Sequence, residues 1–195
     1  MKNIFPLLAI VVAISCFTTT YAQADLKGHS GLYMTSNDYT AQKLNLEVDC
    51  TKESQKIKVD RLFGASKMEI IHEGKKYNYE KKDLYGFRDC NNRDFRFVNN
   101  KEYEIIDNEY FILYNYQTYT TSGRTIVPES EYYISKDPGS PLLPLTVANL
   151  KSLFPDNRKF QDMLDAKTRS EKDLIEFDNY YKKYTIKHLF EESVR

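Results

Sequence analysis

Residues 94–116 read DFRFVNNKEYEIIDNEYFILYNY, and this stretch decides the fold. Apolar and polar residues alternate along it with a period of two, which is typical of half-buried strands. The polar pairs at residues 99–100 and 107–108 interrupt the alternation and have the composition of tight turns. Three strands joined by two short turns predict an antiparallel meander. Residues 110–114 are apolar on both faces, so we expect a central strand that is covered on both sides.

The same alternation extends outward from this stretch over residues 31–136, with turn residues at short intervals. Gly74, for example, lies between two alternating segments and predicts a hairpin with glycine at its turn. The pattern predicts about eight short strands, and it leaves open whether their sheet partly closes into a barrel. The predicted strands are residues 44–48, 56–59, 68–72, 76–80, 84–88, 94–98, 101–106, 110–116 and 131–135.

The C-terminal third has a different composition. Residues 137–145 are rich in proline, so we interpret them as a linker between the β-rich part and a helical part over residues 146–193. The helices predicted there are too short to be stable alone, and we expect them to pack on the sheet. The prediction is therefore a single α+β domain over residues 23–195.

Capping residues mark where the helices should begin. Thr146 and Asp156 are the expected N-caps of two short helices, the first of which ends at Pro155. A capping box at residues 170–173 predicts a third helix, and Thr185 begins a fourth. The residues expected on the inner faces are Phe160, Met163, Leu164, Leu174, Phe177, Tyr181, Tyr184, Ile186, Leu189 and Phe190.

The N-terminus has the pattern of a cleavable export signal. Lys2 supplies a positive charge, and residues 4–17 form an uncharged, mostly apolar run that is shorter than a membrane-spanning helix requires. The small side chains of Thr20 and Ala22 predict cleavage after Ala22, which makes residues 1–22 the signal peptide. Cys16 leaves a second reading open, in which a lipoprotein signal is cleaved before an acylated cysteine that holds the chain on a membrane. We therefore expect the mature chain in the periplasm, on the outer-membrane surface or in the medium.

Two cysteines remain after the signal, Cys50 and Cys90. In an oxidising compartment such a pair predicts one disulfide. Two buried free thiols and a metal site are the alternatives, but neither cysteine has a second ligand at the spacing that a zinc site requires. We expect no metal.

Charge and motifs exclude several classes of function. The chain has 28 lysine and arginine residues and 28 aspartate and glutamate residues, with a formal net charge of +0. This balance gives no electrostatic reason to expect nucleic acid as a partner. The sequence contains neither a phosphate loop nor a dinucleotide fingerprint. Residues 28–31 lack the strand and helix that flank the nucleophile of a serine hydrolase. We therefore expect no cofactor.

The segment from Tyr114 to Arg124 has the composition of a recognition surface. Tyr114, Tyr116 and Tyr119 alternate there with small polar residues, as in loops that hold sugars or peptides. The alternative interpretation is a strand that ends in an ordinary hairpin tip. His72 is added to this candidate surface because it continues the Met68 and Ile70 side of its strand, which points toward the core or a cavity.

Three stretches resemble a group of small exported Bacteroidota proteins of unknown function. They are GLYMTSNDY at residues 31–39, HEGKKY at 72–77 with YGFRDC at 85–90, and NLK at 149–151 with FPDN at 154–157. The resemblance implies export from a bacterium with two membranes, and it implies no catalytic residues.

These observations favour an exported, non-enzymatic protein that binds a protein, peptide or glycan partner. Contact with a membrane is expected only if Cys16 is acylated. Two alternatives stay open. One is a hydrolase outside the cytoplasm that uses His72 and a glutamate of a strand. The other is a lipocalin-like carrier whose strands close around an apolar ligand.

Overall fold

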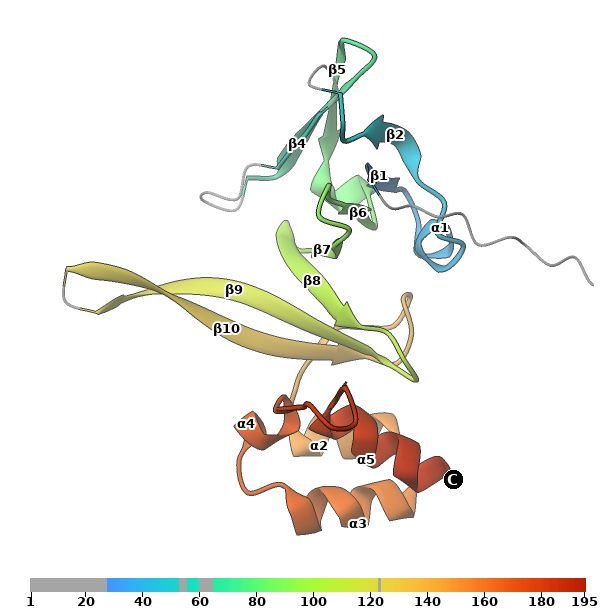
Figure 1. Ribbon diagram of the computed structural model, residues 1–195, viewed down its shortest axis with the longest axis vertical. Helices are drawn as coiled ribbons and strands as arrows, with labels where there is room; N and C mark the ends of the chain where they lie inside the picture. Colours follow the sequence, from blue (N-terminus) through green and yellow to red (C-terminus); the bar gives the residue numbers. More distant parts are fainter. Residues whose placement is uncertain (1–27, 53–55, 60–64, 123) are drawn as a thin grey trace, which may run out of the picture.

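The computed structural model describes residues 28–52, 56–59, 65–122 and 124–195. The predicted signal peptide, its cleavage site after Ala22 and Cys16 lie outside the described residues. Within these ranges the chain has the predicted α+β fold, an antiparallel sheet followed by short C-terminal helices (Figure 1).

The main sheet has eight strands in the order β11-β10-β9-β8-β7-β6-β1-β2, and all neighbours are antiparallel. The strands β6 to β10 form the predicted meander. The sheet is open, with β2 and β11 at its edges, so the partly closed barrel is not formed and the carrier hypothesis loses the enclosure that it requires. The strands are β1 His29–Tyr33, β2 Asn45–Asp49, β6 Gly86–Arg88, β7 Asp94–Val98, β8 Lys101–Asp107, β9 Ile112–Ser122, β10 Thr125–Ser135 and β11 Leu143–Pro144.

Three strands predicted for the meander form a second sheet instead. They are β3 Lys56–Val59, β4 Lys67–His72 and β5 Lys75–Glu80, in the order β3-β4-β5. Met68 and Ile70 of β4 pack on Leu32, Phe87 and other apolar residues of the main sheet. The place in the main sheet beside β6 is taken by β1, a strand that the sequence analysis did not predict. The chain reaches the second sheet from β2 and returns through the 3-10 helix η2 Lys81–Asp83.

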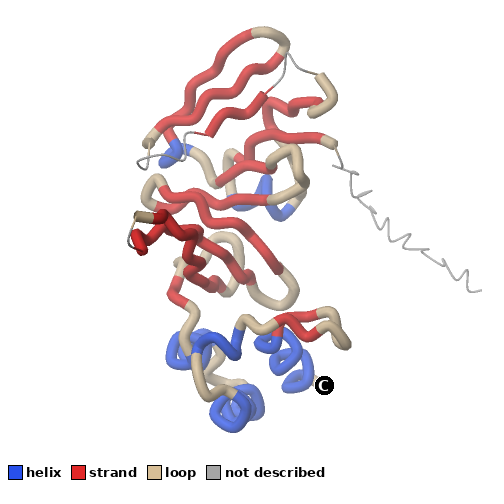
Figure 2. Tube along the Cα trace, turned by 60° about the vertical axis from the view of Figure 1, so that its left-hand side comes forward, coloured by secondary structure: helices blue, strands red, loops and turns tan. Residues whose placement is uncertain are grey.

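The C-terminal helices pack on the face of the main sheet that also carries the second sheet, and they lie next to β9 and β10. Leu113 and Ile134 of the sheet share one buried cluster with Leu150, Phe160 and other residues of the helices. Figure 2 shows the helices α2 to α5 gathered beyond the β-rich part, whereas α1 lies among the strands. The helices are α1 Ser36–Thr40, α2 Val147–Leu153, α3 Arg158–Lys167, α4 Glu171–Leu174 and α5 Thr185–Val194.

Helix capping follows the sequence in most places. Thr146 caps α2, and the capping box of Ser170 and Asp173 begins α4, both as predicted. The cap of α3 is Asn157 and not Asp156, because the Asn157 side chain accepts the hydrogen bond from the Phe160 amide.

The predicted third helix is wrong beyond its first turn. After α4 the chain forms a short hairpin of β12 Phe177–Asp178 and β13 Lys183–Tyr184. The Asp178 carboxylate accepts hydrogen bonds from the amides of Tyr180 and Tyr181, which favours a turn over a continued helix. Tyr181 then stacks on His188 of α5, with ring centroids 3.9 Å apart.

Tyrosines cover the other face of the main sheet. Tyr33, Tyr39, Tyr103 and Tyr114 are buried in one cluster with Ile112. The rings of Tyr33 and Tyr39 meet edge to face, with centroids 5.4 Å apart. Burial raises the pKa of Tyr39 to about 12. Burial, with the Asp94 carboxylate acting in the same direction, raises the pKa of Tyr33 well above its ordinary value.

We expect the protein to lose stability steeply in alkali. Above the ordinary tyrosine pKa of about 10, the unfolded chain loses protons that Tyr33 and Tyr39 retain in the folded state, so stability falls as the pH rises. Two such groups lower the free energy of unfolding by about 2.5 kcal/mol between about pH 10.5 and 11.5. Urea unfolding at each pH, followed by circular dichroism, measures this slope. Burial also raises the pKa of Tyr85, Tyr103, Tyr133 and Tyr184, and these groups add to the slope. Tyr39→Phe should make the profile less steep by the share of one tyrosine, and a flat wild-type profile would contradict the prediction.

Candidate functional site

A pocket of about 310 Å³ opens where three distant segments meet. They are the end of α1, the turn between β8 and β9, and the segment that follows β10, which lie on one side of the molecule in Figure 1. The pocket combines aromatic and apolar side chains with hydroxyl, amide and ammonium groups. Its walls are formed by Tyr39, Thr40, Gln42, Asn108, Tyr110, Phe111, Ile112, Lys136, Asp137 and Pro138.

The β8–β9 turn is strained at Tyr110. The Asp107 carboxylate accepts a hydrogen bond from the Glu109 amide at 2.9 Å, and the Glu109 carbonyl accepts one from the Phe111 amide at 2.7 Å. Tyr110 is therefore the central residue of a three-residue γ-turn, and its φ of 64° is in the left-handed region. A bulky side chain in this conformation costs about 1 kcal/mol or more. Tyr110 is 44% exposed, and the rest of its ring packs on Phe190, with ring centroids 5.4 Å apart, and lies 5.8 Å from the Lys183 ammonium group.

A buried lysine of α5 holds this turn in place. Lys187 is 0% exposed, and its Nζ donates to the Glu109 carbonyl at 2.6 Å and to the Phe111 carbonyl. The same ammonium group lies 3.0 Å from the Asp107 carboxylate. Burial lowers the pKa of Lys187 to about 8, against the opposing effect of Asp107, so the group is still charged at neutral pH. Three acceptors thus take up the three N–H donors of one lysine, all at the strained turn.

Two polar groups of the pocket keep hydrogen-bonding capacity for a ligand. Asn108 donates from Nδ2 to the Tyr39 hydroxyl oxygen at 3.2 Å. The raised pKa of Tyr39 keeps this hydroxyl protonated, so its own hydrogen can be donated. The Asn108 side-chain carbonyl can accept a hydrogen bond at the same place.

The remaining polar groups are mostly engaged within the protein. Gln42 donates from Nε2 to the Tyr39 carbonyl and accepts from Arg88. The Asp137 carboxylate accepts hydrogen bonds from the amides of Gly139 and Ser140 and from the Ser140 hydroxyl. These bonds, that of the Ser140 hydroxyl above all, lower the pKa of Asp137. An ionised carboxylate held in this way is a poor general base, which favours binding over acid–base chemistry at this site.

The residues of the predicted recognition surface do not come together. Tyr114 is 0% exposed, and its hydroxyl bonds to Arg96 and Ser135, so it belongs to the core and not to a surface. Tyr119 and Arg124 are exposed near the end of the β9–β10 hairpin, and Tyr116 is half-buried at its base. Tyr114 and Tyr116 lie on one face of β9 and Tyr119 lies on the other. Both faces are covered at Tyr114, and exposure increases along the strand toward Tyr119.

His72 lies on β4, in the second sheet, and does not line the pocket. It is paired with Lys75 across the β4–β5 hairpin. Within the described residues its Nδ1 atom is buried without a hydrogen-bond partner, and no carboxylate forms an ion pair with it. The catalytic pair that a hydrolase would require is therefore not assembled at His72 in this part of the chain.

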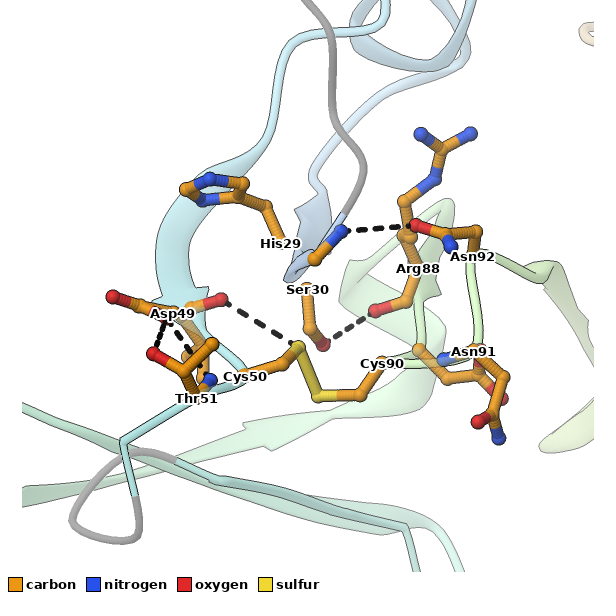
Figure 3. The surroundings of a disulfide bond; sticks show 12 residues. His29, Ser30, Asp49, Cys50, Thr51, Arg88, Cys90, Asn91 and Asn92 are labelled. Carbon is orange, nitrogen blue, oxygen red and sulfur yellow. Dashed lines mark hydrogen bonds between the residues drawn. A yellow bond between two sulfur atoms is a disulfide. The ribbon is translucent and has the colours of Figure 1, made fainter.

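Cys50 and Cys90 form the predicted disulfide, across a sequence separation of 40 (Figure 3). Cys50 follows β2 and Cys90 lies two residues after β6, so the bond joins the two neighbours of β1 at its start. Beside the disulfide, the Ser30 hydroxyl of β1 donates a hydrogen bond to the Arg88 carbonyl at 2.6 Å. The disulfide is consistent with an oxidising compartment.

The described residues contain neither a metal-binding cluster nor a membrane-spanning helix. Over residues 28–52, 56–59, 65–122 and 124–195, no group of three or more histidine, cysteine, aspartate or glutamate side chains could hold a metal ion. In the same ranges, no helix is long and apolar enough to cross a membrane.

Comparison of the chain with family models, with curated proteins and with solved structures yields no match.

Sequence reasoning missed the residues that define this pocket. The sequence pattern predicts a tight turn at Asn108 and the start of a strand at Tyr110, and it indicates no pocket at either residue. The sequence signal at this turn is Lys187, a charged residue beside the predicted inner face of Ile186, Leu189 and Phe190. A lysine in such a position must find acceptors inside the fold.

Proposed function

We propose that the protein is an exported, non-enzymatic binding protein that holds a neutral sugar unit of a glycan in this pocket. The export pattern of residues 1–22 and the Cys50–Cys90 disulfide support a location outside the cytoplasm. The observation that carries the proposal is Tyr110, whose strained backbone presents a partly exposed ring at the pocket. Strained residues of this kind concentrate at functional sites.

The chemistry of the walls favours a sugar over an ion. Lys136 and Asp137 carry opposite charges, so the pocket has no strong preference for an anion or a cation. An aromatic face such as that of Tyr110 can pack on the apolar C–H side of a sugar ring. The Tyr39 hydroxyl and the Asn108 amide can then bond to sugar hydroxyls, which donate and accept in the same way.

We expect Tyr110→Gly to abolish binding while it leaves stability nearly unchanged. Glycine adopts a positive φ without strain, and this relief offsets the lost ring contacts and the entropy that glycine adds to the unfolded chain. The free energy of unfolding should stay within about 1 kcal/mol of the wild-type value. Affinity for the bound sugar should fall at least about tenfold, since one ring face is worth about 1.4 kcal/mol or more.

The measurement is a panel of neutral mono- and oligosaccharides, screened by array and then by calorimetry with the mature protein. Tyr180→Gly is the matched control, because Tyr180 is 85% exposed on the β12–β13 hairpin and does not line the pocket. This control should bind like the wild type. The proposal is wrong if the wild type binds no sugar of the panel, or if Tyr110→Gly binds as well as the control.

A further inference from the structure

The hairpin of β9 and β10 extends beyond the body of the sheet as a two-stranded arm, which we define as residues 116–122 and 125–131 (Figure 1). The pairing of β8 with β9 ends at Asn115, and β11 pairs with β10 only at Tyr133 and Ile134. In the described part of the chain, neither edge of the arm pairs with another strand. Two strands alone are at best marginally stable in water, so an arm of this kind favours a partner.

Pro128 shows which backbone groups face outward. It lies opposite Tyr119 in the register of the arm. Because proline has no N–H to give to β9, this pair is of the type that exchanges no hydrogen bonds. The N–H and C=O groups of Tyr119 therefore point away from β10, to the free edge of β9. Gln117 and Thr121 face the same edge, since direction alternates along a strand.

The two edges of the arm differ in how they are protected. On β10, Pro128 and the charges of Glu129 and Glu131 obstruct the addition of another strand. On β9, residues 116–122 read YQTYTTS, with no charge, no proline and no glycine. Tyr119 on this strand is 68% exposed. Such an uncharged segment of good strand formers is an aggregation hazard unless something covers it.

We propose that a second copy of this chain covers it, with the two β9 strands paired antiparallel about Tyr119. In this register Thr118 faces Thr120 of the other copy, and Gln117 faces Thr121, so no like charges meet. About six main-chain hydrogen bonds form between the copies. The net charge of +0 gives the copies no long-range repulsion to overcome.

The proposed pairing also determines where the two copies lie. The two arms become one four-stranded sheet in the order β10-β9-β9-β10, which removes both unprotected edges at once. Because the strands are antiparallel, the two bodies lie at opposite ends of the paired segment. Seven residues of strand separate them by about 24 Å. The exposed rings of the two Tyr119 residues lie on one face, directly opposite each other.

Sedimentation equilibrium of the mature protein tests this pairing. We expect a dimer in the wild type and a monomer in Thr121→Pro, which removes an outward N–H from β9. Ser130→Pro is the matched control, because Ser130 is opposite Gln117 and the same change there removes an outward N–H from β10. It should stay dimeric. A monomeric wild type at about 100 µM, or equal effects of the two prolines, would overturn the proposal.

A cysteine variant tests the register without proline. Tyr119→Cys places two thiols on Cα atoms about 5.5 Å apart, within the range of a disulfide, and should cross-link two copies under mild oxidation. Thr118→Cys places them on a diagonal of about 7–8 Å and should cross-link far less. Equal cross-linking would contradict the register. Neither experiment depends on a sugar, so failure here is distinguishable from failure of the proposed function.

Discussion

Replacement of both Cys50 and Cys90 by serine should lower the free energy of unfolding by about 4 kcal/mol. The disulfide spans a sequence separation of 40, and closing a loop of that size in the unfolded chain costs about 4 kcal/mol of entropy. In the folded protein the bond joins β2 to the β6–β7 turn at the start of β1. The second sheet, β3 to β5, lies within the closed loop and depends on the same anchoring.

Urea unfolding with and without a reductant measures this effect. The wild type with reductant should behave like the double variant without it, because both lack the same cross-link. The double variant should not respond to the reductant at all. A loss below about 1 kcal/mol would show that the bond contributes little to the fold.

Lys187→Met should lower the free energy of unfolding by about 3 kcal/mol or more. Methionine fills a similar volume, but it leaves the Asp107 carboxylate and two carbonyls at the strained turn without their buried donor. The γ-turn at Tyr110 is then free to relax, because its conformation has lost the group that holds it. The pocket should lose its shape together with the stability.

Lys183→Met is the matched control for this variant. Lys183 lies on β13, two positions before α5 begins. It pairs with Glu109 and Glu191 and keeps 23% of its side chain exposed. Ion pairs with such access to water contribute about 1 kcal/mol or less. Thermal and urea unfolding of both variants should therefore separate them clearly. Equal losses would mean that Lys187 has no special role at the turn.

The fold class could be predicted because hydrophobic periodicity depends on neighbouring residues only. The period of two over residues 94–116 identified the strands and their order in the meander. The same period could not show which sheet a strand joins. Residues 67–80 alternate as clearly as residues 94–106, yet they form a separate sheet, because Met68 and Ile70 are buried against Leu32 and Phe87. Such a choice depends on packing between segments that are far apart in the chain.

Short-range polar contacts explain why the predicted third helix ends after α4. Phe177, Tyr181 and Tyr184 have the spacing of one helical face, and the sequence pattern predicted a helix through them. Instead, the Asp178 carboxylate accepts hydrogen bonds from the amides of Tyr180 and Tyr181, and these bonds close a turn. The contact of Phe177 with Tyr184, at 5.3 Å between centroids, is then made across a hairpin.

The candidate site could not be predicted from the sequence, for a different reason. Its walls come from three segments around Tyr39, Asn108 and Lys136, and no local pattern links them. The two carbonyls that flank Tyr110 are held by Lys187, across sequence separations of 78 and 76. Only the folded structure brings the lysine to the turn.

We propose above that the pocket at the Tyr110 turn holds a neutral sugar, and this proposal has a direct test. Its most direct test is the titration of 15N-labelled mature protein with the neutral oligosaccharide of the panel that binds most tightly, followed in amide correlation spectra. We predict that the largest shifts fall at the amides of residues 40–42, 108–112 and 136–137, and that Tyr110→Gly abolishes them. Largest shifts on the arm or on the β12–β13 hairpin, or spectra that no sugar changes, would contradict the claim.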